Sequence, residues 1–323
     1  MAKKKPESLT IFGESIEPGT AKELNFSFAK LHTNTPIDVP IIIERAKKPG
    51  PTVLFTAGIH GDEVNGVEIV RQLISKGINK PKCGTIICIP IINILGFLQK
   101  SRDFPDGRDL NRSFPGSKKG SLASQVAYKL MNEIVPHVDY CMDFHTGGSS
   151  RFNAPHIRIE KENQQLIELA NIFNAPFILH SKNLKKSFRN ACQKKGIPML
   201  LFEGGKSNSI DAGVSNTGVN GSKRILQHLG MLQSKFKVSV PRKESVTIAK
   251  SRWIRAQASG MFKPTVKVGS YVKPRELLGH IIDPYGKIHY WIRAPKSGYV
   301  FNVNEAPLIY QGDALFHIST EVL

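Results

Sequence analysis

The sequence has no long hydrophobic run and few cysteines. No apolar stretch approaches the roughly 20 residues needed to span a bilayer, and no apolar signal-peptide segment follows the basic start at residues 1–6. The four cysteines lack C-x-x-C spacing, and two of them lie in strand-like apolar runs, so we expect buried free thiols. These absences argue against secretion and membrane insertion and predict a cytoplasmic protein.

Acidic residues are also scarce. The chain has 26 Asp and Glu against 45 Lys and Arg, which gives a net charge of +19. Such a charge can attract nucleic acid, anionic lipid or an acidic substrate. The basic clusters at residues 182–195 and 235–250 lack interleaved aromatic side chains that could stack on bases. We therefore favour a solvated basic face and do not expect nucleic acid or a membrane as a partner.

Apolar runs and helical periods alternate through most of the chain. Two strands are expected first, at residues 24–28 and 39–43. Further strands are expected at residues 52–56, 85–90, 138–144, 177–179 and 198–202, and helices at 64–73, 121–134, 162–173, near 189 and at 219–232. This alternation predicts an α/β fold with a mixed, largely parallel sheet and helices on both faces.

The sequence pattern changes near residue 235. Beyond it there is no helical period, only short β-like pieces broken by Gly and Pro. This segment resembles the barrel-sandwich of lipoyl and biotinyl carrier domains, but no convincing carrier lysine stands at a hairpin tip. We expect two domains, a catalytic α/β domain at residues 1–235 and an all-β domain at residues 236–323.

Histidines and acids follow the predicted strands. His60 and Glu63 come directly after one strand, and His145 ends another. In open α/β sheets ligands bind at the carboxyl ends of strands, and imidazole and carboxylate ligands suit Zn²⁺. An H-x-x-E pattern also arises by chance, in which case His60 would be an ordinary histidine beside a helix-capping Asp62. A lone histidine such as His145 is more often a core residue whose hydrogen bonds are satisfied within the protein. Asp143, Asp62 or a backbone carbonyl could hold the second nitrogen of a ligand histidine.

A third strand end carries Glu203 followed by two glycines. A carboxylate there is the natural general base beside a metal-activated water, because it can take a proton and return it to a leaving nitrogen. The alternative is a carboxylate paired with a nearby Lys or Arg.

The loop at residues 102–116 is dense in polar groups. Arg112 with Asn111 could bind a substrate carboxylate, while another arginine stabilises an oxyanion. A solvated turn with surface ion pairs is the competing interpretation.

Together these segments resemble the succinylglutamate desuccinylase and aspartoacylase family, which is itself similar to the zinc carboxypeptidases. The resemblance rests on residues 58–63, 109–112, 143–145 and 203–205 in this order, and it extends to the β-rich C-terminal segment. It implies a zinc-carboxypeptidase-like fold and one Zn²⁺ per chain held by His60, Glu63 and His145.

The same resemblance implies roles for residues around the metal. Glu203 would work with the zinc-bound water, and Asn111 and Arg112 would bind a substrate carboxylate. Either Arg102 or Arg108 would polarise the scissile carbonyl, and we favour Arg102. In this family the C-terminal barrel can partly cover the active site.

Our leading hypothesis is hydrolysis of a small N-acyl amino acid to a carboxylic acid and an amine. A metallocarboxypeptidase acting on a short or acidic peptide would use the same site. A basic scaffold or nucleic-acid binder, in which the zinc site would be structural or absent, is less favoured. Structural zinc sites normally have four protein ligands, commonly cysteines, whereas this sequence offers three ligands without cysteine. The sequence leaves a monomer and a homo-oligomer both open.

Overall fold

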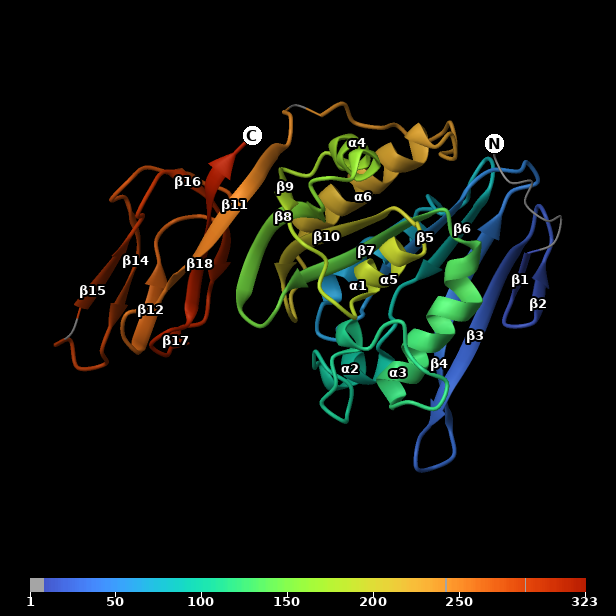
Figure 1. Ribbon diagram of the computed structural model, residues 1–323, viewed down its shortest axis with the longest axis horizontal. Coiled ribbons are helices and arrows are strands. Elements are labelled where there is room, and N and C mark those ends of the chain that lie inside the picture. The colour runs from blue at the N-terminus through green and yellow to red at the C-terminus, as the bar shows by residue number, and fades with distance from the viewer. Residues whose placement is uncertain (1–8, 242, 288) are drawn as a thin grey trace.

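The computed structural model describes residues 9–241, 243–287 and 289–323, so the basic start at residues 1–6 lies outside the described residues. Figure 1 shows helices and strands interleaved over the first part of the chain and strands alone in the C-terminal part. In the described part of the chain, no helix is long and apolar enough to cross a membrane. The expected mixed α/β architecture is confirmed.

One large mixed sheet runs through the molecule. In spatial order its twelve strands are β13 (Tyr271–Val272), β16 (Gly298–Asn304), β18 (Ala314–Val322), β11 (Val246–Arg255), β9 (Phe177–His180), β8 (Arg151–Ile159), β10 (Met199–Lys206), β7 (Tyr140–Gly147), β5 (Thr52–Ala57), β6 (Thr85–Ile89), β4 (Pro36–Arg45) and β3 (Ala21–Lys30). The neighbours β6, β5, β7 and β10 are parallel to one another. Their carboxyl ends therefore meet at one edge.

Helices cover both faces of this sheet, as expected (Figure 1). They are α1 (Val64–Ser75), α2 (Ile94–Gln99), α3 (Leu122–Lys129), α4 (Gln164–Phe173), α5 (Phe188–Lys194) and α6 (Ala212–His228), with short helices at Leu110–Arg112, Leu130–Ile134 and Val135–His137. Buried residues of α1, α4 and α6 form one core with the sheet, and those of α3 and α5 form another. Alternation along β5 serves both cores, since Val53 and Phe55 face the first and Leu54 the second.

Most expected elements lie where the sequence predicts them, but the bounds of one helix differ, and α2, β8 and the strands at Leu9–Ile11 and Glu14–Ile16 were not expected. The helix expected at 219–232 runs from Ala212 to His228, where Asp211 accepts a hydrogen bond from Val214 N and so caps the helix. Strand β8 has no counterpart among the expected elements, because Pro155 interrupts its pattern. Of the four free cysteines, Cys88, Cys141 and Cys192 are buried and Cys83 is half-buried.

The C-terminal segment is all-β in its described residues and has its own apolar core. Some of its strands form a second sheet, of β15 (His289–Arg293), β14 (Leu277–Ile282), β12 (Gly260–Pro264) and β17 (Leu308–Ile309). Its other strands join the large sheet, since β11 pairs with β9 and β16 pairs with β8. The division at 235/236 stays a prediction. A separate hairpin of β1 (Leu9–Ile11) and β2 (Glu14–Ile16) precedes the large sheet.

Helix α1 packs unusually close to β7. A Cβ on Gly66 would lie 2.4 Å from the carbonyl oxygen of Phe144. We predict that Gly66→Ala lowers the free energy of unfolding by about 1–3 kcal/mol, because the added methyl group must push helix and strand apart. Helix propensity alone would raise it by up to about 1 kcal/mol. Denaturant unfolding of the wild type and the variant measures the sign of the change in the free energy of unfolding.

Gly213→Ala on α6 is the matched control. Its Cβ would meet only the side chain of Asp211, at 3.2 Å, so we expect unchanged or raised stability. A stabilised Gly66→Ala protein would contradict the close packing of α1 on β7.

Candidate metal and catalytic site

The segment after β5 places His60 and Glu63 at the edge of the sheet. The chain leaves the strand through Gly58, whose φ is +61°. A Cβ on Gly61 would lie 1.9 Å from the carbonyl carbon of Gly96, so only glycine permits the contact between this turn and α2. Glu63 then stands immediately before α1. The turn and the helix start together fix both side chains.

His145 and Glu203 come from the neighbouring parallel strands. His145 lies in β7 and Glu203 in β10, and the two residues are paired in register. The pairing of β10 with β7 shifts between Glu203 and Lys206, and its pairing with β8 shifts between Glu203 and Gly205, where Gly205 has φ +77°. The expectation that these three strand ends meet is confirmed.

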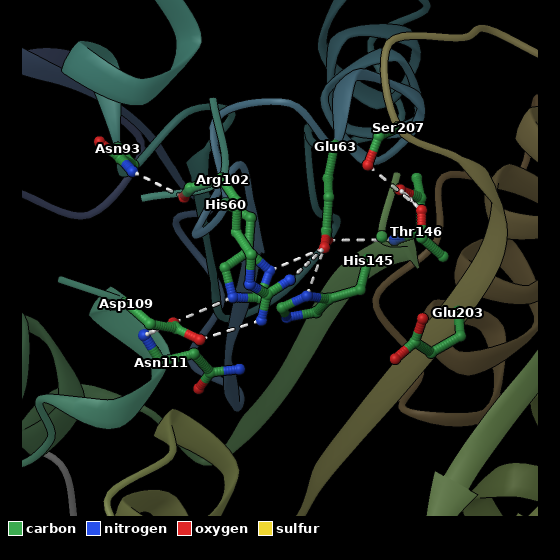
Figure 2. Close-up of polar contacts among 12 residues, drawn as sticks. His60, Glu63, Asn93, Arg102, Asp109, Asn111, His145, Thr146, Glu203 and Ser207 are labelled. Atoms are coloured by element: carbon green, nitrogen blue, oxygen red, sulfur yellow. Dashed lines mark hydrogen bonds and ion pairs between the residues drawn. The ribbon is translucent and has the colours of Figure 1, made fainter. Parts of the chain in front are cut away.

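The Glu63 carboxylate contacts both imidazoles, as Figure 2 shows. Its Oε1 lies 2.7 Å from His60 Nδ1, and its Oε2 lies 2.9 Å from His145 Nδ1 and accepts a hydrogen bond from Thr146 N at 3.1 Å. Burial raises the pKa of Glu63, but the two histidines outweigh it and hold the pKa well below its usual range. Glu63 is therefore a buried carboxylate in contact with an imidazole nitrogen of both histidines.

The second nitrogen of each imidazole also meets a carboxylate. His145 Nε2 lies 2.7 Å from Asp143 Oδ2, and His60 Nε2 lies 3.1 Å from Asp109 Oδ1. Burial lowers the pKa of both histidines, yet the surrounding carboxylates outweigh it and raise both values. Asp143 is one of the partners expected for a ligand histidine, whereas Asp109 was not among those considered.

This arrangement fits a metal ion. One donor atom from each of His60, Glu63 and His145 can be chosen so that all lie within 4.8 Å of one another, and all three residues are buried. Two histidines and one glutamate form a donor set of catalytic zinc sites, and carboxylates that hold the far nitrogens orient the rings. The described residues can thus hold a metal through the two Nδ1 atoms and Glu63.

Arg102 lies beside this cluster and Arg108 does not. Arg102 donates from Nη2 to Asp109 Oδ2 at 3.0 Å and lies 3.4 Å from Glu63 Oε1 through Nη1. The side chain of Arg108 is 63% exposed and pairs with Asp106. The loop therefore brings only the favoured one of the two candidate arginines into the pocket.

The cluster opens into a cavity of about 380 Å³. Asn111 and Arg112 line it together with Glu203. Asn111 Oδ1 accepts a hydrogen bond from Phe188 N at 2.9 Å, which ties the loop to α5. All seven residues favoured as site residues from the sequence line this one cavity, namely His60, Glu63, Arg102, Asn111, Arg112, His145 and Glu203.

Several residues of the site were missed. The cavity is also lined by Arg158, Lys182 and Arg189, and Asn153 donates from Nδ2 to Glu203 Oε2 at 3.0 Å. Arg158 and Asn153 belong to the unexpected strand β8. Arg189 is only 8% exposed and donates to Ser181 and to the carbonyl of Lys182. It lies in the basic cluster at 182–195, and that cluster was the only signal for it in the sequence.

Comparison with known proteins gives a consistent result. Residues 49–229 match the family model of the succinylglutamate desuccinylase/aspartoacylase catalytic domain. The chain is 27% identical over 259 residues to the N-alpha-acetyl-L-2,4-diaminobutyric acid deacetylase of Halomonas elongata, covering 76% of this chain and 74% of that protein.

Solved structures share the fold. The product-bound ectoine utilization protein EutE (DoeB) from Ruegeria pomeroyi aligns with a TM-score of 0.83 at 22% identity, over 98% of this chain and 100% of that one. A succinylglutamate desuccinylase/aspartoacylase from Rhodobacter sphaeroides aligns with a TM-score of 0.80 at 23% identity, over 93% of this chain and 94% of that one.

The hydrogen bond from His145 to Asp143 leads to a test of the metal-binding geometry. We predict that Asp143→Asn weakens Zn²⁺ binding about 10- to 100-fold, because the carboxylate orients the imidazole and makes it a better ligand. Competition with a chromophoric chelator measures the affinity. Asp139→Asn is the control, since Asp139 accepts from Thr52 N just before the other end of β7. Equal affinities in the two variants would contradict the assignment.

Proposed function

We propose that this chain, which belongs to the succinylglutamate desuccinylase/aspartoacylase family, hydrolyses the amide bond of a small N-acyl amino acid. The products are a carboxylic acid and an amine. The observation that carries the proposal is the convergence of the His60, Glu63 and His145 donor atoms in one cavity with Glu203 and Arg102. The deacetylase from Halomonas elongata acts on an N-acyl amino acid, which supports the same reaction class.

His60, Glu63 and His145 would hold one Zn²⁺ per chain. Zinc bound there would polarise the acyl carbonyl and make a water molecule more acidic. The Asp109 and Asp143 carboxylates keep the imidazoles turned toward this point. The chain itself supplies the remaining acid, base and charge.

Glu203 is the proposed general base. Its carboxylate takes a proton from the attacking water and returns it to the leaving nitrogen. Asn153 and Arg158 hold it, with Arg158 Nε 3.4 Å from Oε1. Arg102, anchored by Asp109, stabilises the negative charge that develops on the carbonyl oxygen.

Positive charge in the cavity supports a substrate with a carboxylate. Asn111 and Arg112 are proposed to bind the carboxylate of the amino acid, because a guanidinium group matches it bidentately. Lys182 and Arg189 add further cationic groups to the lining. We also propose that residues 1–235 form the catalytic unit and residues 236–323 a C-terminal β domain.

Glu203→Gln tests the base. We predict that kcat falls about 10²- to 10⁴-fold while bound zinc is unchanged, because glutamine keeps the shape of the side chain but cannot accept the proton. Steady-state kinetics and metal analysis measure the two quantities. Glu162→Gln, whose side chain is 78% exposed, should match the wild type. Full activity in Glu203→Gln would remove Glu203 as the base.

A substrate panel tests the reaction. Acetyl, succinyl and peptidyl derivatives of anionic, neutral and amine-bearing amino acids are incubated with the zinc-loaded protein, and released amine is measured with and without a chelator. We predict hydrolysis of N-acyl amino acids that the chelator abolishes. Cleavage of the peptidyl derivatives alone would indicate a carboxypeptidase. Salt-sensitive retention of nucleic acid without metal or turnover would indicate a binding protein.

A further inference from the structure

A polar contact connects Glu203 to the C-terminal β segment. The Oε2 atom of Glu203 accepts the hydrogen bond from Asn153 Nδ2 on β8, and Asn153 Oδ1 in turn lies 2.5 Å from Asn302 Nδ2 on β16. Asn153 and Asn302 are directly opposite each other in the antiparallel pair of β8 and β16. They are 3% and 4% exposed. Hydrogen bonds therefore link side chains on three strands, and the two asparagines in this series are buried.

The chemistry of the carboxylate determines which atoms donate and which accept along this series of hydrogen bonds. An ionised carboxylate only accepts hydrogen bonds, so Asn153 must present its amino group to Glu203 and its oxygen to the other side. Asn302 must then offer a donor to that oxygen, and it does so through Nδ2. The orientation of the Asn302 amide thus determines which end of Asn153 faces Glu203.

In this orientation, Asn302 donates to Asn153, but its own side-chain oxygen is left without a partner. Within the described residues, Asn302 Oδ1 is buried and has no hydrogen-bond partner. Buried side-chain polar atoms almost always have one, so an exception requires an explanation. A residue kept only for packing between β8 and β16 would not need a donor at this point. The need for a donor opposite Asn153 Oδ1 explains why the side-chain oxygen of Asn302 has no partner.

We propose that Asn302 is a positioning residue that fixes the Glu203 carboxylate through Asn153. The inference rests on the proposed role of Glu203 as the base. Other charged and titratable groups also surround Glu203: Arg158 on β8, Arg189 on α5, His145 opposite it on β7 and His156 opposite it on β8. Arg158 attracts the carboxylate from one side only, and Asn153 holds its other oxygen.

Asn302→Asp is the most direct test. An aspartate at this position accepts from Asn153, which must turn and present its oxygen to Glu203, so two oxygens repel each other. We expect kcat to fall about 10- to 100-fold with KM changed less than about threefold, since a shift of roughly 1 Å in a catalytic group costs about 10²-fold. Zinc content should stay unchanged.

Asn304→Asp is the matched control on the same strand. Asn304 donates from Nδ2 to Ala314 O and accepts from Ala306 N, within the C-terminal segment. It should behave as the wild type. If Asn302→Asp does not fold, Asn302→Ala serves instead, because it removes the donor without adding a charge. For this variant we expect a kcat loss of about tenfold.

Coupling to Glu203 separates positioning from a general structural effect. In a Glu203→Gln background, Asn302→Asp should cause no further loss of kcat, because its effect passes through the same group. Equal losses of kcat in the presence and absence of Glu203 would overturn the proposal. So would an Asn302 variant with wild-type kcat.

Crystal structures of the full-length variants give a readout that is independent of activity. In Asn302→Asp we expect Asn153 turned and the Glu203 carboxylate displaced. An unchanged Glu203 would overturn the proposal even if activity fell. If no N-acyl amino acid is hydrolysed by the wild type but the displacement is seen, the proposed function fails and the positioning by Asn302 stands.

Discussion

The site depends on the contacts that the buried Glu63 carboxylate makes with its neighbours. The Glu63 side chain is 2% exposed, its oxygens lie 2.7 Å from His60 Nδ1 and 2.9 Å from His145 Nδ1, and Oε2 accepts a hydrogen bond from Thr146 N. An isolated charge in the interior costs several kcal/mol, so Glu63 is stable only while His60 and His145 remain beside it. The histidines in turn are held by Asp109 and Asp143 at their far nitrogens. The three proposed metal ligands are therefore arranged by the protein itself, as a preorganised metal site requires.

Backbone packing away from the chemistry keeps Glu63 and His145 at this distance. Gly66 lies in the first turn of α1 and rests on the carbonyl of Phe144, the residue before His145. Gly61 allows the turn before Glu63 to contact α2. Any side chain at these glycines would move Glu63 relative to His145. The C-terminal segment enters the same structure, because β16 reaches β8 and, through it, the strand that carries Glu203.

Local sequence predicts the parts of the site that lie at strand ends. His60, His145 and Glu203 follow apolar runs, and parallel strands bring such ends together. Strand β8 was missed because Pro155 breaks its pattern. Pro155 lies between Asn153, where the pairing of β8 with β16 ends, and His156, where the pairing of β8 with β9 begins. The contact of Asp109 with His60 and the pairing of β16 with β8 join residues distant in sequence, and no local period carries that information.

The central claim is that His60, Glu63 and His145 hold the zinc ion of an N-acyl amino acid hydrolase. An anomalous difference map collected at the zinc absorption edge, from crystals of protein with measured activity, tests it most directly. We predict one strong peak per chain in contact with Nδ1 of both histidines and with the Glu63 carboxylate. Active protein whose map holds no peak at these three side chains, or holds its zinc elsewhere, would contradict the account.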